Sequence, residues 1–227
     1  MTIATDAPRM PLTDADILLI GLGTDAAHRM LLQWQEETPG LHDFMPDYHR
    51  LQLEHWIWSC AQAMDFASKR VLDIGAQNPR RWIGPGYQTF GNTVDSQNDV
   101  VGDLLNLASS VKGDRWDVIL CTEVLEHCGD PFIAARELRK TLAPGGLLLA
   151  TSPFCWPDHH TQDYPDYWRF TEQGWRHLFR HFSKVDVTAC AWTSEAQALL
   201  DLVRRFEGWG FRHHVGMTTG YLVEAWK

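Results

Sequence analysis

The stretch that decides the fold of this 227-residue chain is Val71-Leu72-Asp73-Ile74-Gly75-Ala76-Gln77-Asn78-Pro79. A short apolar run that ends in an acid and a glycine is typical of a buried strand followed by a turn. The segment before it, 48–66, has a different period, because its apolar residues recur mainly at helical spacing. The sequence therefore predicts an amphipathic helix that leads into a buried strand, with a glycine turn at the carboxyl end of that strand.

Strand patterns and helical patterns alternate through the rest of the chain. The predicted strands are 87–95, 100–102, 116–121, 147–151, 185–191 and 221–226. The predicted helices are 131–142, a helix capped by Thr171 that runs through 182, and a helix capped by Ser194 that runs through 206. Strands that alternate with helices indicate an α/β protein with a doubly wound, mainly parallel sheet.

Composition indicates one α/β domain with an N-terminal extension. A hydrophobic content of 44% and a charged content of 22% supply enough material for one substantial domain and too little for two. The net charge of -9 argues against a nonspecific nucleic-acid partner and against an anionic membrane surface. Five cysteines without a C-x-x-C pair favour a reducing, cytoplasmic setting. No apolar run approaches the roughly 18 residues that a membrane span needs.

Two stretches compete as a cofactor site. The first, Gly21–Ala26, has the pattern G-x-G-x-x-A after an apolar run, which alone suggests the dinucleotide site of an NAD-dependent oxidoreductase. Such a site also needs a second strand that ends in an acid about 20 residues later. Segment 36–49 contains prolines and has no strand pattern. We therefore favour an N-terminal helix or packed segment as the interpretation of Gly21–Ala26.

The second stretch is the one around Asp73, and here the downstream parts are present. Asp95 ends the next predicted strand, 20 residues after Gly75, where a carboxylate can accept hydrogen bonds from both hydroxyls of a ribose. Asp103 follows a third short strand, where it could meet an adenine amino group while Leu104 packs on the ring. A fourth element, 116–127, is a buried strand that runs into an acidic turn. Four elements in order are more specific than any one alone.

The ordered motifs VLDIGAQ, TVDSQ, VVGDLLNL, WDVILCTEVLEH, LRKTLAPGGLLLATSPF and HHTQDYPDYWRFT resemble those of class I S-adenosylmethionine (AdoMet)-dependent methyltransferases, in the broad methyltransferase-11 group. The resemblance covers about residues 69–190. It implies a Rossmann-like sheet of seven strands in the order 3-2-1-4-5-7-6, with the last-numbered strand antiparallel. The implied organisation is a methyltransferase domain over 68–227, preceded by an N-terminal arm and helical cover over 1–67.

The resemblance also implies which residues hold the cofactor. By this resemblance, the methionine part is contacted by Asp73, Gly75 and Ala76. The ribose is contacted by Asp95 with Ser96, and the adenine by Asp103 with Leu104. The methionine amino end is assigned to Cys121 and Thr122, with Glu123 beside them. The implied function is AdoMet-dependent methyl transfer to an oxygen or nitrogen of a small-molecule acceptor.

The first loop departs from the family pattern. Gln77 stands where the second glycine of the family is expected, and Pro79 where a third often falls. Glycine is favoured there because the backbone must come close to the ligand without a Cβ in the way. We expect Gln77 to tilt aside and hydrogen-bond the cofactor. The alternative is a degenerate loop in a noncatalytic binding or scaffold protein.

The acceptor side is expected in segment 154–169, which follows the fifth strand and combines aromatic rings with two imidazoles. Methyl transfer is an in-line displacement in which the protein supplies alignment, exclusion of water and a base. His159 or His160 could be that general base for a hydroxyl acceptor. The competing interpretation is a packed lid, which we expect to be the main role of Tyr167, Trp168 and Phe170.

A divalent cation is a further possibility at Glu123, Glu126 and His127. If a helix begins just after the strand, these positions share one face, and His159 or His160 could complete a cage for the ion. The E-x-x-E-H pattern is similar to that of metal-using ubiquinone-pathway and small-RNA 2′-O-methyltransferases. The same residues occur in relatives without a metal, where they form the turn and the active-site wall. We favour the second interpretation, with His127 as a candidate catalytic residue.

Overall fold

The computed structural model describes residues 33, 37, 48–76, 79–92, 98–113, 115–161, 164–190, 218 and 220–227. Several predictions lie outside these residues and stay predictions: the Gly21–Ala26 motif, the role of Gln77, the ribose site at Asp95 and Ser96, and the helix over 194–206.

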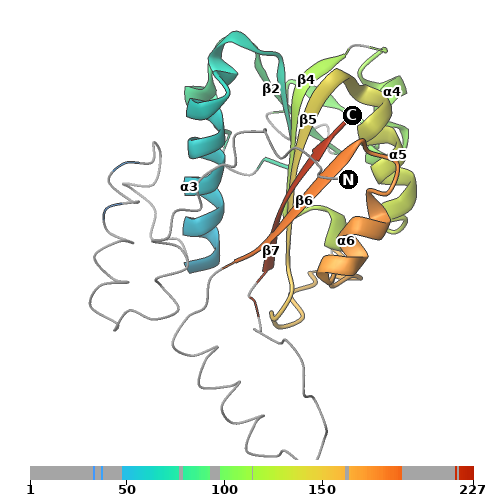
Figure 1. Ribbon diagram of the computed structural model, residues 1–227. Coiled ribbons are helices and arrows are strands. Elements are labelled where there is room, and N and C mark those ends of the chain that lie inside the picture. The colour runs from blue at the N-terminus through green and yellow to red at the C-terminus, as the bar shows by residue number, and fades with distance from the viewer. Residues whose placement is uncertain are drawn as a thin grey trace, which may run out of the picture.

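One sheet of seven strands organises the described chain (Figure 1). The strands are β1 Val71–Ile74, β2 Tyr87–Gly91, β3 Val100–Val101, β4 Trp116–Thr122, β5 Leu142–Pro153, β6 Lys184–Ala189 and β7 Gly220–Trp226. Their order is β3-β2-β1-β4-β5-β7-β6. β7 is antiparallel to both of its neighbours, and all the other pairs are parallel. The predicted strand order and the antiparallel last strand are confirmed.

Helices cover both faces of the sheet. The α-helices are α3 Tyr48–Ala63, α4 Leu107–Ser110, α5 Pro131–Thr141 and α6 Glu172–Leu178, and the 3-10 helices are η1 Phe66–Ser68, η2 Arg81–Ile83, η3 Leu104–Asn106 and η4 Leu125–His127. Figure 1 shows α3 on one side of the sheet and α4, α5 and α6 on the other. No helix among the described residues combines the length and apolar character needed to cross a membrane.

Two hydrophobic cores follow from this layering, because successive side chains of a strand point to opposite faces. In β1, Leu72 and Ile74 belong to the core under α5 and α6, while Val71 belongs to the core under α3. β4 contributes Ile119 to the first core and Leu120 to the second, and neither is exposed. Burial on both faces explains why these strands are almost continuously apolar in sequence.

The start of α5 was predicted correctly, and the chain after it differs from the prediction. The Asp130 carboxylate accepts hydrogen bonds from the backbone N–H groups of Phe132 and Ile133, and Pro131 takes the first helical position. The helix ends at Thr141 and β5 begins at the next residue, whereas the sequence predicted a strand only from 147. The Ala143–Gly146 stretch therefore forms the start of a long strand instead of a connecting loop.

The helix capped by Thr171 is shorter than predicted. The Thr171 hydroxyl accepts from Gly174 N at 3.0 Å, which confirms the cap. α6 ends at Leu178 because Phe179 leaves the helical conformation, with φ -96° and ψ 21°. The turn that follows buries both Phe179 and Phe182 in the core. Burial of two large rings thus outweighs continuation of the helix to 182.

Candidate cofactor and acceptor site

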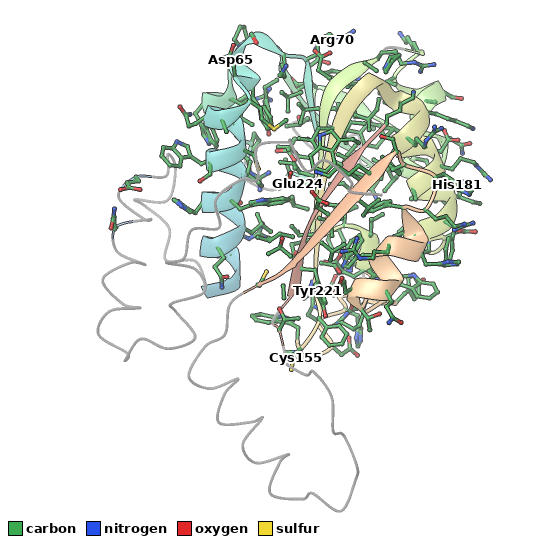
Figure 2. The ribbon with its side chains drawn as sticks, in the orientation of Figure 1. Asp65, Arg70, Cys155, His181, Tyr221 and Glu224 are labelled. Carbon is green, nitrogen blue, oxygen red and sulfur yellow. The ribbon has the colours of Figure 1, made fainter. Side chains whose placement is uncertain are left out.

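The carboxyl ends of β1 and β4 form the centre of the candidate site. These two strands are parallel neighbours, with Ile74 opposite Cys121, yet the chain leaves β1 for β2 and β3 before it returns to β4. In open α/β sheets, ligands bind in the crevice where the strand order reverses in this way. Figure 2 shows this edge at the bottom, where Cys155 and Tyr221 are labelled, and the opposite edge at the top with Asp65 and Arg70.

Gly75 makes the turn that follows β1. Its φ is +70°, and its N–H donates to Phe90 O at 2.8 Å. A Cβ at this position would lie 2.8 Å from Cγ2 of Val124, which is closer than real Cβ contacts. Ala76 follows, half-buried. Conformation and space both require glycine here, and they leave backbone exposed at the switch point, as a bound cofactor needs.

Asp73 is fully buried at the end of β1 and belongs to an ion-pair network. Its Oδ2 accepts from Arg80 Nη1 at 2.7 Å and from the Tyr87 hydroxyl at 2.6 Å. Arg80 also donates through Nε and Nη2 to both carboxylate oxygens of Glu54, at 2.8 and 2.7 Å. The network therefore connects helix α3 to the strand end beside Gly75. Sequence reasoning missed Arg80 and Glu54, because no periodic pattern relates them to Asp73.

The network has an unused hydrogen-bond acceptor. Asp73 Oδ1 is buried and has no hydrogen-bond partner among the described residues. Burial raises the pKa of Asp73, against the opposing effect of the Arg80 guanidinium. Burial alone would lower the pKa of Arg80, but the two carboxylates outweigh it and raise that pKa. The orphaned Asp73 oxygen is a buried acceptor that fits the ammonium end of AdoMet.

The other described cofactor candidates occupy different settings. Asp103 is exposed and caps η3, since its Oδ1 accepts from Leu105 N at 2.9 Å. Leu104 is half-buried against the core. Cys121 is fully buried within the core, where burial raises the pKa of its thiol. Thr122 is buried at the end of β4. Asp103 and Thr122 thus lie at the carboxyl edge, whereas the Cys121 thiol faces the core.

Glu123 turns the chain after β4, and this corrects a prediction. Its φ is +56°, so no α-helix begins here. Its N–H lies 3.2 Å from both the carbonyl and the hydroxyl oxygen of Thr151, and its Oε1 accepts from that hydroxyl at 2.7 Å. The expected helix with positions 123, 126 and 127 on one face is wrong. A short 3-10 turn, Leu125–His127, takes its place.

That turn brings Glu126 and His127 against His159 from the segment after β5. His127 Nε2 lies 3.8 Å from Glu126 Oε1, and the rings of His127 and His159 meet edge to face with centroids 5.0 Å apart. One potential ligand atom from each of the three residues lies within 4.8 Å of the others. We call Glu126, His127 and His159 the carboxylate–imidazole cluster.

Glu126 gives the cluster its electrostatic character. The residue is not exposed, and neither carboxylate oxygen has a hydrogen-bond partner among the described residues. Burial, and then the nearby Glu123 carboxylate, raise the pKa of Glu126 well above its ordinary value. An isolated buried carboxylate is unfavourable unless it gains a proton or a positive partner. The cluster can therefore accept a proton or hold a cation.

His160 does not join the cluster. Its ring pairs with Asp158, with 2.7 Å between Nδ1 and Oδ1, and both side chains are about two thirds exposed, at 66% and 68%. The hydrogen bond that His160 donates to the Asp158 carboxylate raises the pKa of His160. Of the two imidazoles that the sequence offered as a base, the structure brings only His159 into the cluster.

The segment 164–169, which we call the latch, fastens this arrangement. Tyr167 N and Trp168 N both donate to Glu126 O, at 2.8 and 3.2 Å, and Trp168 Nε1 donates to Cys128 O at 2.7 Å. His127 Nδ1 lies 2.6 Å from Pro165 O. Phe170, just after the latch, is buried, whereas Tyr167 is 59% exposed. Phe170 thus packs in the core, and Trp168 stacks on it while 38% exposed. The Tyr167 ring is not packed as predicted, and a lid role for these residues stays a prediction.

Comparison with known proteins agrees with this geometry. Residues 45–194, well over half of the chain, match the family model of a methyltransferase domain. The chain belongs to this methyltransferase family. The predicted membership in the class I AdoMet-dependent methyltransferases is thereby confirmed, and AdoMet is the cofactor that the family implies.

The methyltransferase has curated relatives of more than one kind. It is 31% identical over 158 residues to the ubiquinone biosynthesis O-methyltransferase of Burkholderia vietnamiensis, and this match covers 61% of the present chain and 63% of the relative. It is 37% identical over 62 residues to the enzyme of the same name from Cereibacter sphaeroides, which covers 27% and 23%. It is 30% identical over 109 residues to the tRNA U34 carboxymethyltransferase of Campylobacter hominis, which covers 40% and 38%. The chain spans less than two thirds of the length of these relatives.

Solved structures are more distant. An S-adenosylmethionine-dependent methyltransferase from Archaeoglobus fulgidus is 14% identical, with a TM-score of 0.49, and the match covers 80% of this chain and all of that one. One from Mesorhizobium loti is 15% identical, with a TM-score of 0.47 and coverage of 75% and 97%. The fold assignment therefore rests on the strand order and on the family match.

Proposed function

We propose that this methyltransferase transfers the methyl group of AdoMet to an oxygen or nitrogen of a small-molecule acceptor. The observation that carries the proposal is the carboxylate–imidazole cluster, which lies after β4 and β5 at the edge where Gly75 follows β1. A nucleophilic oxygen or nitrogen carries a proton that must leave, and the cluster offers groups that can take it. The names of several relatives, ubiquinone biosynthesis O-methyltransferases, support an oxygen acceptor.

Residues around β1 would hold the cofactor. Bound AdoMet supplies a methyl carbon that its sulfonium makes electrophilic. Gly75 and Ala76 would lie against the methionine part, and Asp73 Oδ1 would accept from the ammonium group. Thr122 would line the same end, and Asp103 with Leu104 would contact the adenine. Gln77 and the ribose carboxylate predicted at Asp95, with Ser96, complete the proposed set.

The protein's share of the chemistry is alignment and proton removal. Attack in line with the sulfonium requires the acceptor atom to be held on the far side of the methyl carbon. Residues of the latch and the segment after β5 would form that wall. An imidazole nitrogen of His159 would take the acceptor proton, and the adjacent Glu126 carboxylate would stabilise the imidazolium that results.

A second candidate is cation-assisted transfer at the same cluster. A buried carboxylate with two unused oxygens, flanked by two imidazoles whose ligand atoms lie within 4.8 Å, suits a divalent ion of the transition series. The ion would orient the acceptor and lower the pKa of its hydroxyl. Titration of Mn²⁺ into wild type and Glu126→Gln tests this: binding lost in the variant supports the ion, and activity unchanged by a chelator contradicts it.

A small-molecule acceptor is the partner we infer. The net charge of -9 disfavours the phosphate backbone of a nucleic acid, although one relative is named for a tRNA. All five cysteines are free thiols, which fits the cytoplasmic setting expected from the sequence.

The test is an assay of S-adenosylhomocysteine release over a panel of phenols, catechols, alcohols and amines, with His159→Asn and His160→Asn compared. We expect turnover on a hydroxyl acceptor, a loss of about 100-fold or more in His159→Asn, and activity within about twofold of wild type in His160→Asn. Equal losses in both variants would contradict the role of the cluster. Turnover on any acceptor would exclude a noncatalytic protein.

A further inference from the structure

Asp166 is a buried carboxylate beside His159 that the proposed reaction does not yet use. Its side chain is 1% exposed. We propose that Asp166 is the positioning residue of His159: it holds the proton of the neutral imidazole on Nδ1 and so leaves the lone pair of Nε2 for the cluster. This inference rests on the proposed function only in naming His159 as the working imidazole.

Two contacts from one residue fix the relative placement of His159 and Asp166. The backbone N–H of His159 donates to Asp166 Oδ2 at 3.1 Å, and His159 Nδ1 lies 3.0 Å from the same oxygen. The hydrogen-bond partners of the two ring nitrogens determine which nitrogen of a neutral histidine carries the proton. A carboxylate only accepts, so the nitrogen beside it must be the donor.

Asp166 is itself held in place by Arg169. The guanidinium contacts both carboxylate oxygens, with Nη2 to Oδ2 at 2.6 Å. The same guanidinium donates to Pro157 O at 3.2 Å and to Trp168 O at 2.9 Å, so it spans the segment that carries His159. The hydrogen bond with Arg169 is the main cause that holds the pKa of Asp166 well below its ordinary value. The carboxylate therefore stays ionised at neutral pH and can only accept.

The ring contact is close but not yet aligned. His159 Nδ1 is buried, and at 3.0 Å from Oδ2 its N–H does not point along the line to that oxygen. Hydrogen bonds at active sites are often poorly aligned before substrate binds and tighten in the complex. No other hydrogen-bond partner is available to Nδ1 among the described residues. Asp166 Oδ2 is thus the acceptor that lies within hydrogen-bond distance of this nitrogen.

The chain contains a matched aspartate–histidine pair outside the cluster. Asp158 accepts from the backbone N–H of His160 at 3.1 Å and lies 2.7 Å from His160 Nδ1, so the two contacts repeat those of Asp166. Both side chains are exposed to water, which competes for the ring. Asp158→Asn is therefore a matched control. It removes a carboxylate that contacts the backbone and the ring of His160, a histidine outside the cluster.

The experiment is ¹⁵N imidazole NMR of the full chain at a pH where its imidazoles are neutral, with signals assigned by His159→Asn and His160→Asn. We expect His159 of the wild type to carry its proton on Nδ1. In Asp166→Asn the population should shift toward the Nε2–H form that dominates for imidazoles in water, and Asp158→Asn should leave His159 unchanged. Arg169→Lys keeps the charge but loses the two-pronged contact, so it should give a partial shift even if Asp166→Asn fails to fold.

Kinetics supply the second readout. Asp166→Asn should lower kcat at least about 10-fold, the lower end of the effect of losing a partner that orients a functional histidine, while the KM for AdoMet stays within about twofold. Wild-type His159 protonated on Nε2, or a tautomer unchanged in folded Asp166→Asn or Arg169→Lys, would overturn the proposal. The tautomer is measured without turnover, so its result is separate from failure to find a methyl acceptor.

Discussion

Glu126 is the side chain that makes the candidate site able to accept a proton or a cation. It is a carboxyl group that is removed from water and has no hydrogen-bond partner among the described residues, and it lies against two imidazoles. Native proteins rarely keep such a group without a purpose, because its desolvation is not compensated. The cluster is therefore expected to cost folding stability in return for reactivity.

Replacing Glu126 tests that expectation. The raised pKa means that the folded state holds this proton more tightly than the unfolded state, whose value is near 4.5. The penalty is absent below that pH, grows as pH rises toward the folded pKa, and is complete above it. With divalent ions removed, Glu126→Gln should raise the free energy of unfolding at pH 8 by about 1 kcal/mol or more, the usual cost of a buried polar group without a hydrogen-bond partner, and should abolish most activity. Urea unfolding across pH measures the effect.

A buried carboxyl with good partners provides the control. Glu137 is also buried, but its oxygens accept from Ala108 N at 3.2 Å and from Lys140 Nζ at 2.6 Å. Glu137→Gln should lower the free energy of unfolding, which is the opposite sign. Stabilisation by Glu137→Gln, or loss of stability in Glu126→Gln at pH 8, would contradict the account of Glu126.

Gly75 offers a second test at the same scale. Gly75→Ala meets both a left-handed backbone and the Val124 side chain, while Gly113→Ala meets a similar φ of +79° with nothing within 4 Å. We expect Gly113→Ala to cost about 1 kcal/mol and Gly75→Ala about 1 to 3 kcal/mol more, measured by chemical unfolding. Equal costs would show that the Val124 contact does not restrict this turn.

At the scale of elements, helix α3 is joined to β1 by a buried ion-pair network as well as by apolar packing. Leu53, Trp56 and Ile57 of α3 pack in the core on its face of the sheet. Arg80 bridges Glu54 of the helix and Asp73 of the strand, and its side chain is only 6% exposed. The position of the cofactor loop therefore depends on a helix that the sequence indicates only as a cover.

Substitution of the neighbouring residues Arg80 and Arg81 compares the buried ion-pair network with an exposed ion pair. Arg80→Met leaves the buried Asp73 carboxylate without its guanidinium and should cost about 3 to 5 kcal/mol. Arg81 pairs with Asp99 while 51% exposed, so Arg81→Met should cost less than about 1 kcal/mol. Thermal and urea unfolding of both variants gives the comparison, and similar losses in the two would show that the network is not a special constraint.

Local patterns predicted the elements well where side chains near in sequence decide them. The start of α5 at Pro131, the Thr171 cap and the strand around Asp73 could all be predicted from short motifs. The early end of α6 could not be predicted from the sequence, because it depends on how Phe179 and Phe182 pack in the core. The prediction of a helix over 123–127 was wrong for a related reason. A contact with Thr151, which is distant in sequence, fixes the backbone of Glu123.

On the scale of the whole molecule, the order of strands places residues from distant motifs at one edge. Gly75 follows β1, Asp103 follows β3 and Glu123 follows β4, and parallel strands put all three at the same end of the sheet. Motif order in the sequence was enough to predict this convergence. The ion-pair partners of Asp73 and His159, Arg80 and Asp166, could not be predicted, because tertiary packing alone brings them together.

The central claim is that this edge binds AdoMet, and calorimetric titration of AdoMet into the full chain tests it most directly. We expect binding in the micromolar range by wild type, competition by S-adenosylhomocysteine, and affinity at least about tenfold weaker in folded Gly75→Ala, since the added Cβ displaces the turn. Gly113→Ala should bind as wild type does. No binding at millimolar AdoMet, or undiminished affinity in Gly75→Ala, would contradict the account.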